Sequence, residues 1–169
     1  MNAREVFGHW DTVRRDLLRG LERFTEEDLD FQPAPAYQRT VGDIARHIAE
    51  AEDGWFHYVV RGEHSAWPDY PREAYPNWES ITKALERVHH KTLAWLETVD
   101  QADLNQAVTT PWDEEISLRW IIWHVLEHEI HHRGELFLCL GLLGQDSGHL
   151  KDVTYMNGFG PPSTGLPES

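Results

Sequence analysis

The sequence predicts an all-α protein in which four helices form an antiparallel bundle with long connecting loops. The first observation is that four segments of roughly twenty residues carry apolar residues at steps of three and four, which places them on one helical face. The second is that proline-containing stretches, which end helices, separate these segments. A length of 169 residues with 40% hydrophobic residues also suits one domain with a substantial core.

The first half of the chain predicts two of the helices. Ala3–Phe24 carries the apolar spacing throughout, so we expect one continuous helix there. The second helix begins at Thr40, because Thr40 and Asp43 have the spacing of a capping box, and it continues to Val60. Three prolines and several aromatic residues follow in Gly62–Pro76, which we expect to be an ordered loop.

The second half of the chain predicts the other two helices. The third begins near Asn77. The segment Asn105–Ile116 contains β-branched residues beside a proline and predicts a short extended piece. Ser117 then caps the fourth helix, which runs to Leu143 and is stopped by Gly144.

We expect residues 1–156 to form the bundle and residues 157–169 to form a C-terminal tail rich in proline and glycine. The connections are longer than those of an ideal up-and-down bundle, so they leave room for a crossover.

Charge and composition exclude several classes of partner. The net charge is −14, from 29 acidic and 15 basic residues, which argues against binding to nucleic acid or to an anionic membrane. A single cysteine, Cys139, allows no intramolecular disulfide and suits a reducing compartment. No apolar run of a secretory signal follows Met1, so we expect a cytoplasmic protein.

Helical phase selects three of the eleven histidines. At 100° per residue, His128 and His132 lie one turn apart on or beside the apolar face of the fourth helix, whereas His124 drifts toward its boundary. His47 lies at the edge of the apolar stripe of the second helix and is the best third ligand. We expect the remaining histidines to be solvated or at a boundary, some on helices and others in the loop or the tail: His9, His57, His64, His89, His90, His131 and His149.

Residue chemistry alone leaves two interpretations open for this cluster. Two imidazoles one turn apart on a helix, joined by a third from a neighbouring helix, can hold one divalent metal ion. The same imidazoles can also form a hydrogen-bonded structural network at the edge of the core.

Two segments resemble the DinB-like (damage-inducible) superfamily. The first is Thr40–Trp55, which contains His47, and the second is Leu118–Leu136, which contains the pattern HxxxHRGxL with His128 and His132. The resemblance implies a four-helix bundle, often a homodimer, with a three-histidine site for Zn or Ni completed by water. Related branches include metal-dependent transferases that use low-molecular-weight bacterial thiols, an isomerase that requires such a thiol, and hydrolases.

Three histidine ligands leave an open coordination position, which is typical of catalytic sites. The resemblance to the thiol-using branches implies a thiol-dependent S-transferase that acts on small electrophiles, with a low-molecular-weight thiol as co-substrate. The alternatives are a hydrolase that uses a metal-bound water and a non-catalytic metal-binding or dimerisation module.

Four carboxylates are candidates to orient an imidazole N–H: Glu50, Glu52, Glu129 and Glu135, of which Glu135 is favoured. Glu129 has an alternative role as a surface partner of Arg133. Cys139 is a doubtful nucleophile, because its position predicts burial in the core.

Overall fold

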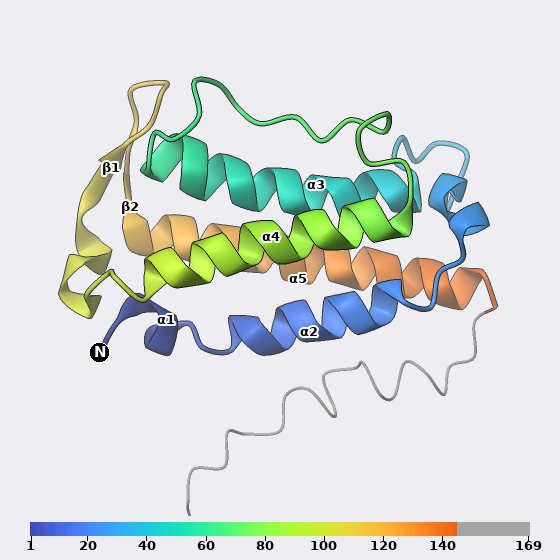
Figure 1. Ribbon diagram of the computed structural model, residues 1–169, viewed down its shortest axis with the longest axis horizontal. Coiled ribbons are helices and arrows are strands. Elements are labelled where there is room, and N and C mark those ends of the chain that lie inside the picture. The colour runs from blue at the N-terminus through green and yellow to red at the C-terminus, as the bar shows by residue number, and fades with distance from the viewer. Residues whose placement is uncertain (145–169) are drawn as a thin grey trace, which may run out of the picture.

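Four long helices form the bundle seen in the computed structural model, which describes residues 1–144 (Figure 1). The predicted boundary at residue 156, the tail 157–169 and His149 lie outside the described residues. The helices are α1 (Ala3–Val6), α2 (Trp10–Leu21), α3 (Val41–Asp53), α4 (Trp78–Leu96) and α5 (Leu118–Leu142), with two 3-10 helices at Glu26–Asp30 and Gln101–Asn105. The strands β1 (Ala107–Thr109) and β2 (Glu115–Ser117) form an antiparallel hairpin. The predicted all-α bundle with long loops is confirmed.

The long connection between α3 and α4 is the crossover for which the sequence leaves room. It returns along the length of the bundle, so α3 and α4 run in the same direction, opposite to α2 and α5 (Figure 1). On its other side, α3 packs against α5, which runs antiparallel to it. This antiparallel pair carries the histidines selected from the sequence.

Two predicted helices differ in detail from the structure. The continuous helix expected over Ala3–Phe24 is wrong, because residues 7–9 separate α1 from α2. Backbone pairing explains the separate α1: the Ala3 N–H donates to the Val99 carbonyl at 2.8 Å, which ties the N-terminus to the end of α4. The helix expected to end at Val60 does so, but its last turns, Gly54–Val60, are π-helical.

Local capping explains where the helices begin. The Thr40 hydroxyl accepts from the Asp43 N–H at 3.1 Å, and the Asp43 carboxylate accepts from the Thr40 N–H at 3.0 Å, which confirms the predicted capping box. The Ser117 hydroxyl likewise accepts from the Trp120 N–H at 3.2 Å. Gly144 has a φ of 72°, a left-handed conformation that suits the residue after a helix end.

The core consists of two apolar clusters separated by a buried polar layer. One cluster joins the end of α2 to the start of α3 and α4, and the other joins α1 to the start of α5. The polar layer takes one residue from each long helix: Arg14, Glu52, His89 and Glu129. Each of these side chains is at most 7% exposed.

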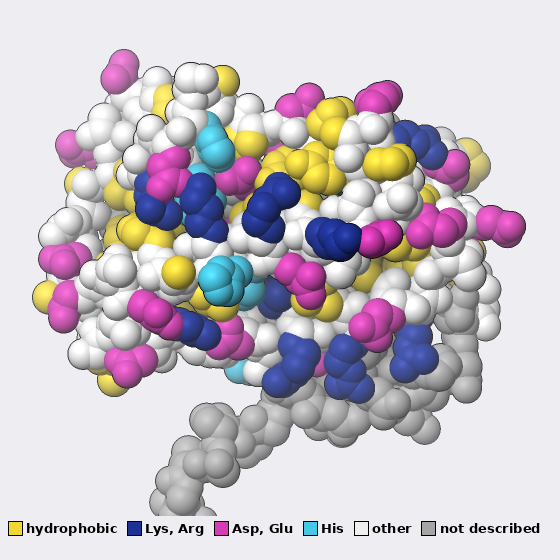
Figure 2. Space-filling model, viewed as in Figure 1, with side chains coloured by type: hydrophobic (Ala, Val, Ile, Leu, Met, Phe, Trp, Pro, Cys, Tyr) yellow, Lys and Arg dark blue, Asp and Glu magenta, His cyan; other side chains and the backbone are white. Residues whose placement is uncertain are grey.

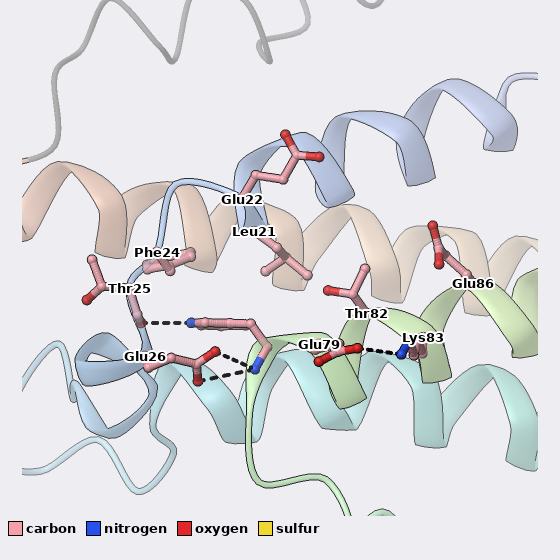
Figure 3. Close-up of a pocket in the computed structure, with 10 residues that line it drawn as sticks. Leu21, Glu22, Phe24, Thr25, Glu26, Glu79, Thr82, Lys83 and Glu86 are labelled. Carbon is pink, nitrogen blue, oxygen red and sulfur yellow. Dashed lines mark hydrogen bonds and ion pairs between the residues drawn. The ribbon is translucent and has the colours of Figure 1, made fainter.

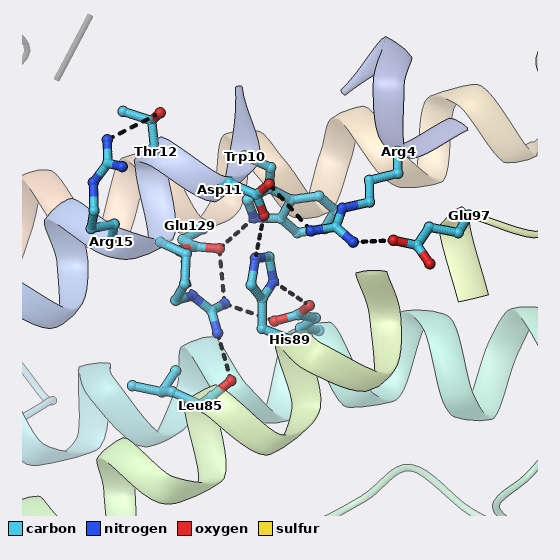
Figure 4. Close-up of polar contacts among 11 residues, drawn as sticks. Arg4, Trp10, Asp11, Thr12, Arg15, Leu85, His89, Glu97 and Glu129 are labelled. Atoms are coloured by element: carbon cyan, nitrogen blue, oxygen red, sulfur yellow. Dashed lines mark hydrogen bonds and ion pairs between the residues drawn. The ribbon is translucent and has the colours of Figure 1, made fainter. Parts of the chain in front are cut away.

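Arg14 holds the polar layer together. Its guanidinium donates to Glu52 at 2.7 Å, to Glu129 at 2.8 and 2.9 Å, and to the Leu85 carbonyl at 2.7 Å. Figure 4 shows these contacts between the helices, together with the bond between the His89 ring and Glu52 at 2.9 Å. The two carboxylates raise the pKa of Arg14 against the opposing effect of its burial.

The burial of three residues corrects the sequence analysis. Glu129 accepts from Arg14 and from the Trp10 indole, so it is not a surface partner of Arg133. His89, expected at a boundary, is buried because Glu52 on α3 supplies its polar partner. His57, expected toward solvent, is fully buried, because the π-helical turn rotates the residues that follow Gly54.

On the surface, acidic and basic side chains are interspersed over the face formed by α2 and α4 (Figure 2). Within residues 1–144, every helix is too short or too polar to cross a lipid bilayer.

Candidate metal centre

The structure brings the three predicted ligands together between α3 and α5. The Nε2 atom of His128 lies 3.0 Å from Nε2 of His47 and 3.1 Å from Nε2 of His132. The three ligand nitrogens all lie within 4.8 Å of one another. The rings meet edge to face, at 67° between His47 and His128 and 76° between His128 and His132, so the nitrogens converge on a common point.

Two local features produce this convergence. His128 and His132 are four residues apart, so their side chains project from the same side of α5, one turn apart. His47 projects from α3, which packs against α5 along much of its length. Both pieces of geometry follow from helical phase and from the packing of these two helices.

Burial keeps the two imidazoles of α5, His128 and His132, neutral. It lowers the pKa of His128 to about 3, and the neighbouring rings of His132 and His47 lower it further. Burial also lowers the pKa of His132, although the carboxylate of Glu135 opposes this. A neutral imidazole has the lone pair that a metal ion requires, so both residues are in the ligating protonation state at neutral pH.

Glu135 determines which nitrogen of His132 carries the proton. The Nδ1 of His132 lies 2.6 Å from a Glu135 oxygen, and the Tyr37 hydroxyl donates to the other oxygen at 2.7 Å. An ionised carboxylate accepts only, and the pKa of Glu135 is lowered by Tyr37 and His132 in spite of burial, so Nδ1 donates. The Nε2 of neutral His132 therefore presents a lone pair to the other two rings.

Glu50 stands behind His47 in a similar way. A Glu50 oxygen lies 3.6 Å from Nδ1 of His47, and the Trp67 indole N–H donates to the other oxygen at 3.0 Å. The contact with His47 and the bond from Trp67 lower the pKa of Glu50, although burial opposes them. Two of the four carboxylates predicted to orient an imidazole, Glu50 and Glu135, thus face the outer nitrogen of a histidine in the group His47, His128 and His132, which we call the triad.

The arrangement fits a divalent metal ion. Two nitrogens held ~2.0–2.1 Å from one tetrahedral ion are ~3.3–3.4 Å apart, close to the separations of 3.0 and 3.1 Å. Hydrogen bonds alone do not satisfy this group: the Nε2 of His132 has no proton, and the Nε2 of His128 cannot donate to His132 and accept from His47 at the same time, so at most one of the two contacts is a linear hydrogen bond. A cation at the meeting point satisfies all three lone pairs.

The other candidate residues lie outside this triad. Glu52 and Glu129 belong to the polar layer, where both accept hydrogen bonds from Arg14. Within residues 1–144, neither is hydrogen-bonded to a histidine of the triad. Cys139 is buried in an apolar cluster, and burial raises the pKa of its thiol. A second group, His131, His132 and Glu135, also has metal-ligand spacing, but His131 is largely exposed.

Sequence reasoning missed Tyr37. It lies in the irregular segment before α3, where no periodicity predicts the direction of a side chain. Its hydrogen bond to Glu135 raises the pKa of Tyr37 to about 12, together with burial, so the phenol is a donor at neutral pH.

The cavities near and far from the triad differ in character. One of about 330 Å³ opens on His47 and is lined by polar residues that include Arg39 and Glu50. Another of about 610 Å³ lies between α2 and α4, with Phe24 and Trp78 among its lining residues (Figure 3). No imidazole lines this larger cavity, so it is separate from the metal centre.

Comparisons with known proteins relate this fold to one superfamily. The model of the DinB superfamily matches residues 9–136. The uncharacterized protein YjoA of Bacillus subtilis (strain 168) is 22% identical over 144 residues, which cover 84% of this chain and 91% of YjoA. The crystal structure of YjoA, a DinB-like protein, superposes with a TM-score of 0.66 at 17% identity, over 84% of this chain and 93% of that one. A DinB-like protein from Bacillus cereus gives 0.68 at 20% identity, over 82% and 90%.

Proposed function

The chain belongs to the DinB superfamily, and from this premise we propose that it is a metal-dependent enzyme whose ion is held by His47, His128 and His132. The observation that carries the proposal is the meeting of three Nε2 atoms, with that of His128 lying 3.0 and 3.1 Å from those of His47 and His132. Imidazole ligands suit Zn and Ni, which are the metals we propose.

A divalent ion held there would supply an open coordination position and lower the pKa of a thiol or a water. The protein's own contribution is orientation. Glu135 and Tyr37 hold the ring of His132 in one tautomer, and Glu50 faces the outer nitrogen of His47. Burial keeps His128 neutral.

We propose thiol transfer to a small electrophile as the reaction. Cys139 is buried in the core, so the nucleophile has to come from a bound molecule. Both carboxylates beside the triad already accept hydrogen bonds, Glu135 from Tyr37 and His132, and Glu50 from Trp67. These hydrogen bonds lower the pKa of both carboxylates, which makes each a weaker base toward an attacking water, whereas a thiol needs only the ion to become a thiolate. These contacts favour transfer over hydrolysis.

Metal analysis tests the site itself. We expect about one equivalent of metal per chain in protein purified without a histidine tag, and its loss in His128→Ala. His131→Ala is the matched control, because His131 is a neighbour on α5 but 68% exposed and outside the triad. Equal metal content in wild type and His128→Ala would contradict the assignment. Loss of metal in His131→Ala alone would instead indicate a site formed by His131, His132 and Glu135.

A thiol screen tests the reaction. Conjugation of iodoacetamide or 1-chloro-2,4-dinitrobenzene that requires both metal and added thiol supports transfer. Turnover of an activated ester with water alone supports a hydrolase instead. Stoichiometric metal without turnover of any of these compounds would leave a metal-binding module and refute the enzyme assignment.

A further inference from the structure

Five aromatic side chains gather beside the metal centre. Trp55 is at the middle of this group, and its ring centroid lies 5.1–6.1 Å from those of Trp67, Trp112, Trp120 and His124, all at steep angles. We call these five residues the aromatic wall. They come from the π-helical turns Gly54–Val60 that follow α3, the loop after them, the β1–β2 turn and the start of α5, so the fold collects them from four segments.

The aromatic wall is continuous with the triad on both of its flanks. On α5, His124 lies one turn before His128, with ring centroids 6.4 Å apart. On α3, the Trp67 indole donates to Glu50, whose other oxygen faces His47. A molecule that lies on the wall therefore has its far end beside the proposed metal ion.

The wall is exposed, although indoles are usually covered. Trp67, Trp112 and Trp120 remain 37%, 46% and 48% exposed. Exposed clusters of large apolar side chains mark binding surfaces in soluble proteins.

The exposed indoles are also held in fixed positions, as in a preorganised site. The N–H groups of Trp67 and Trp112 bond to Glu50 and Glu114 at 3.0 and 2.9 Å. The ring of Trp67 lies so close to Gly54 that a Cβ there would meet it at 2.4 Å. Trp120 stacks on His124 with centroids 4.8 Å apart and 6° between the planes. Ordering such rings before a ligand arrives lowers the entropic cost of binding.

We propose that the aromatic wall binds the planar aromatic part of the electrophilic substrate and holds its reacting carbon beside the metal centre. This inference rests on the proposed function and adds the class of substrate: small, planar aromatic electrophiles. With a chloroarene, the sulfur attacks the carbon that bears chlorine, a C–S bond forms, chloride leaves with the C–Cl electron pair, and the thiol proton goes to solvent.

The test compares two tryptophans of α5 that are equally exposed. Trp120 and Trp123 are each 48% exposed, but Trp123 packs edge-on against Phe7 and lies outside the wall. The probe is 1,3-dinitrobenzene, a neutral planar ring without a leaving group, and its affinity is measured by ligand-observed NMR. We expect Trp120→Leu to weaken binding about 3- to 10-fold, the range expected for one aromatic contact, and Trp123→Leu to change it less than 2-fold.

A catalytic arm uses two electrophiles of different shape. Trp120→Leu should lower kcat/KM for 1-chloro-2,4-dinitrobenzene by a similar factor and leave that for iodoacetamide, which has no ring, unchanged. Equal losses for both electrophiles, or equal effects of the two variants on dinitrobenzene binding, would overturn the proposal. So would dissociation of an oligomer in Trp120→Leu by sedimentation, because the wall would then be an interface between copies of the chain.

Two features keep the outcomes distinct. Binding of 1,3-dinitrobenzene needs neither thiol nor turnover, so an inactive enzyme would refute the proposed function without deciding the role of the wall. Unfolding midpoints report whether Trp120→Leu folds. If it does not, Trp112→Leu, on the exposed β1–β2 turn, replaces it with the same expected loss.

Discussion

Replacing Arg14 by methionine removes the guanidinium that Glu52 and Glu129 share inside the bundle. The side chain is 4% exposed, and the two carboxylates are 1% and 2% exposed. Methionine has a similar length and packs well among apolar neighbours, so Arg14→Met creates little empty volume. The perturbation is therefore electrostatic: two buried carboxylates lose the cation that stabilises their charge.

The structure sets the expected magnitude. Removing one partner of a buried ion pair costs about 3–5 kcal/mol, because the charge that remains is left without compensation. Arg14 bonds both carboxylates at 2.7–2.9 Å, so its loss should lie at the upper end, about 4–5 kcal/mol. This is a large share of the stability of about 5–15 kcal/mol that is usual for a domain.

Urea unfolding at pH 7, followed by circular dichroism, measures the change. Arg15→Met is the matched control: its guanidinium is exposed and contacts only the Thr12 hydroxyl, at 3.4 Å, among the residues described, so we expect a change below about 0.5 kcal/mol. Should Arg14→Met prevent folding, Arg14→Lys keeps the charge with fewer bonds and should fold with an intermediate loss. A loss in Arg14→Met below about 1 kcal/mol would refute the reasoning.

Two further predictions concern carboxylates. Burial raises the pKa of Glu52, but Arg14 and His89 outweigh it and hold the pKa at about 2, below the ordinary 4.5. Glu52 thus adds stability above pH 4.5, about 3 kcal/mol, which is lost as the pH falls toward 2. If the urea midpoint falls as steeply in Glu52→Gln as in wild type between pH 4.5 and pH 2, this contribution of Glu52 to stability is contradicted. Glu135→Gln should weaken metal binding about 10- to 100-fold, because an amide orients His132 without a charge. Competition with a chelating dye measures the affinity, and the exposed Glu127→Gln is the control, in which we expect no change. Equal affinities in wild type and Glu135→Gln would count against this role of Glu135.

Much of the fold was predictable because helices are local. Apolar spacing and caps such as Thr40 and Ser117 depend on residues close in sequence, and they predict where α3 and α5 begin. The parallel course of α3 and α4 was not predictable, because an apolar stripe is the same whichever way a helix runs. That course depends on the path of residues 61–77.

The polar layer was missed for a related reason. A prediction from helical periodicity assigns polar residues to the exposed face of a helix. The sequence pattern therefore gave no sign that Arg14, Glu52 and His89 are buried. Their burial depends on partners contributed by other helices. The spacing of His128 and His132, by contrast, lies within one helix and was readable from the sequence.

Two residues of the polar layer, Glu52 and Glu129, lie on the same two helices as the candidate metal centre, and this has a consequence for function. Glu52 follows His47 on α3 by five residues, and Glu129 follows His128 directly on α5. Arg14 bonds both carboxylates, so it resists sliding of α3 against α5. A slide of one residue would move His128 by about 1.5 Å along its axis, half of its present 3.0 Å separation from His47. Apolar side chains tolerate such a shift more readily than directional hydrogen bonds do. We therefore expect the buried charges, costly as they are to desolvate, to hold the imidazoles at the spacing that one ion requires.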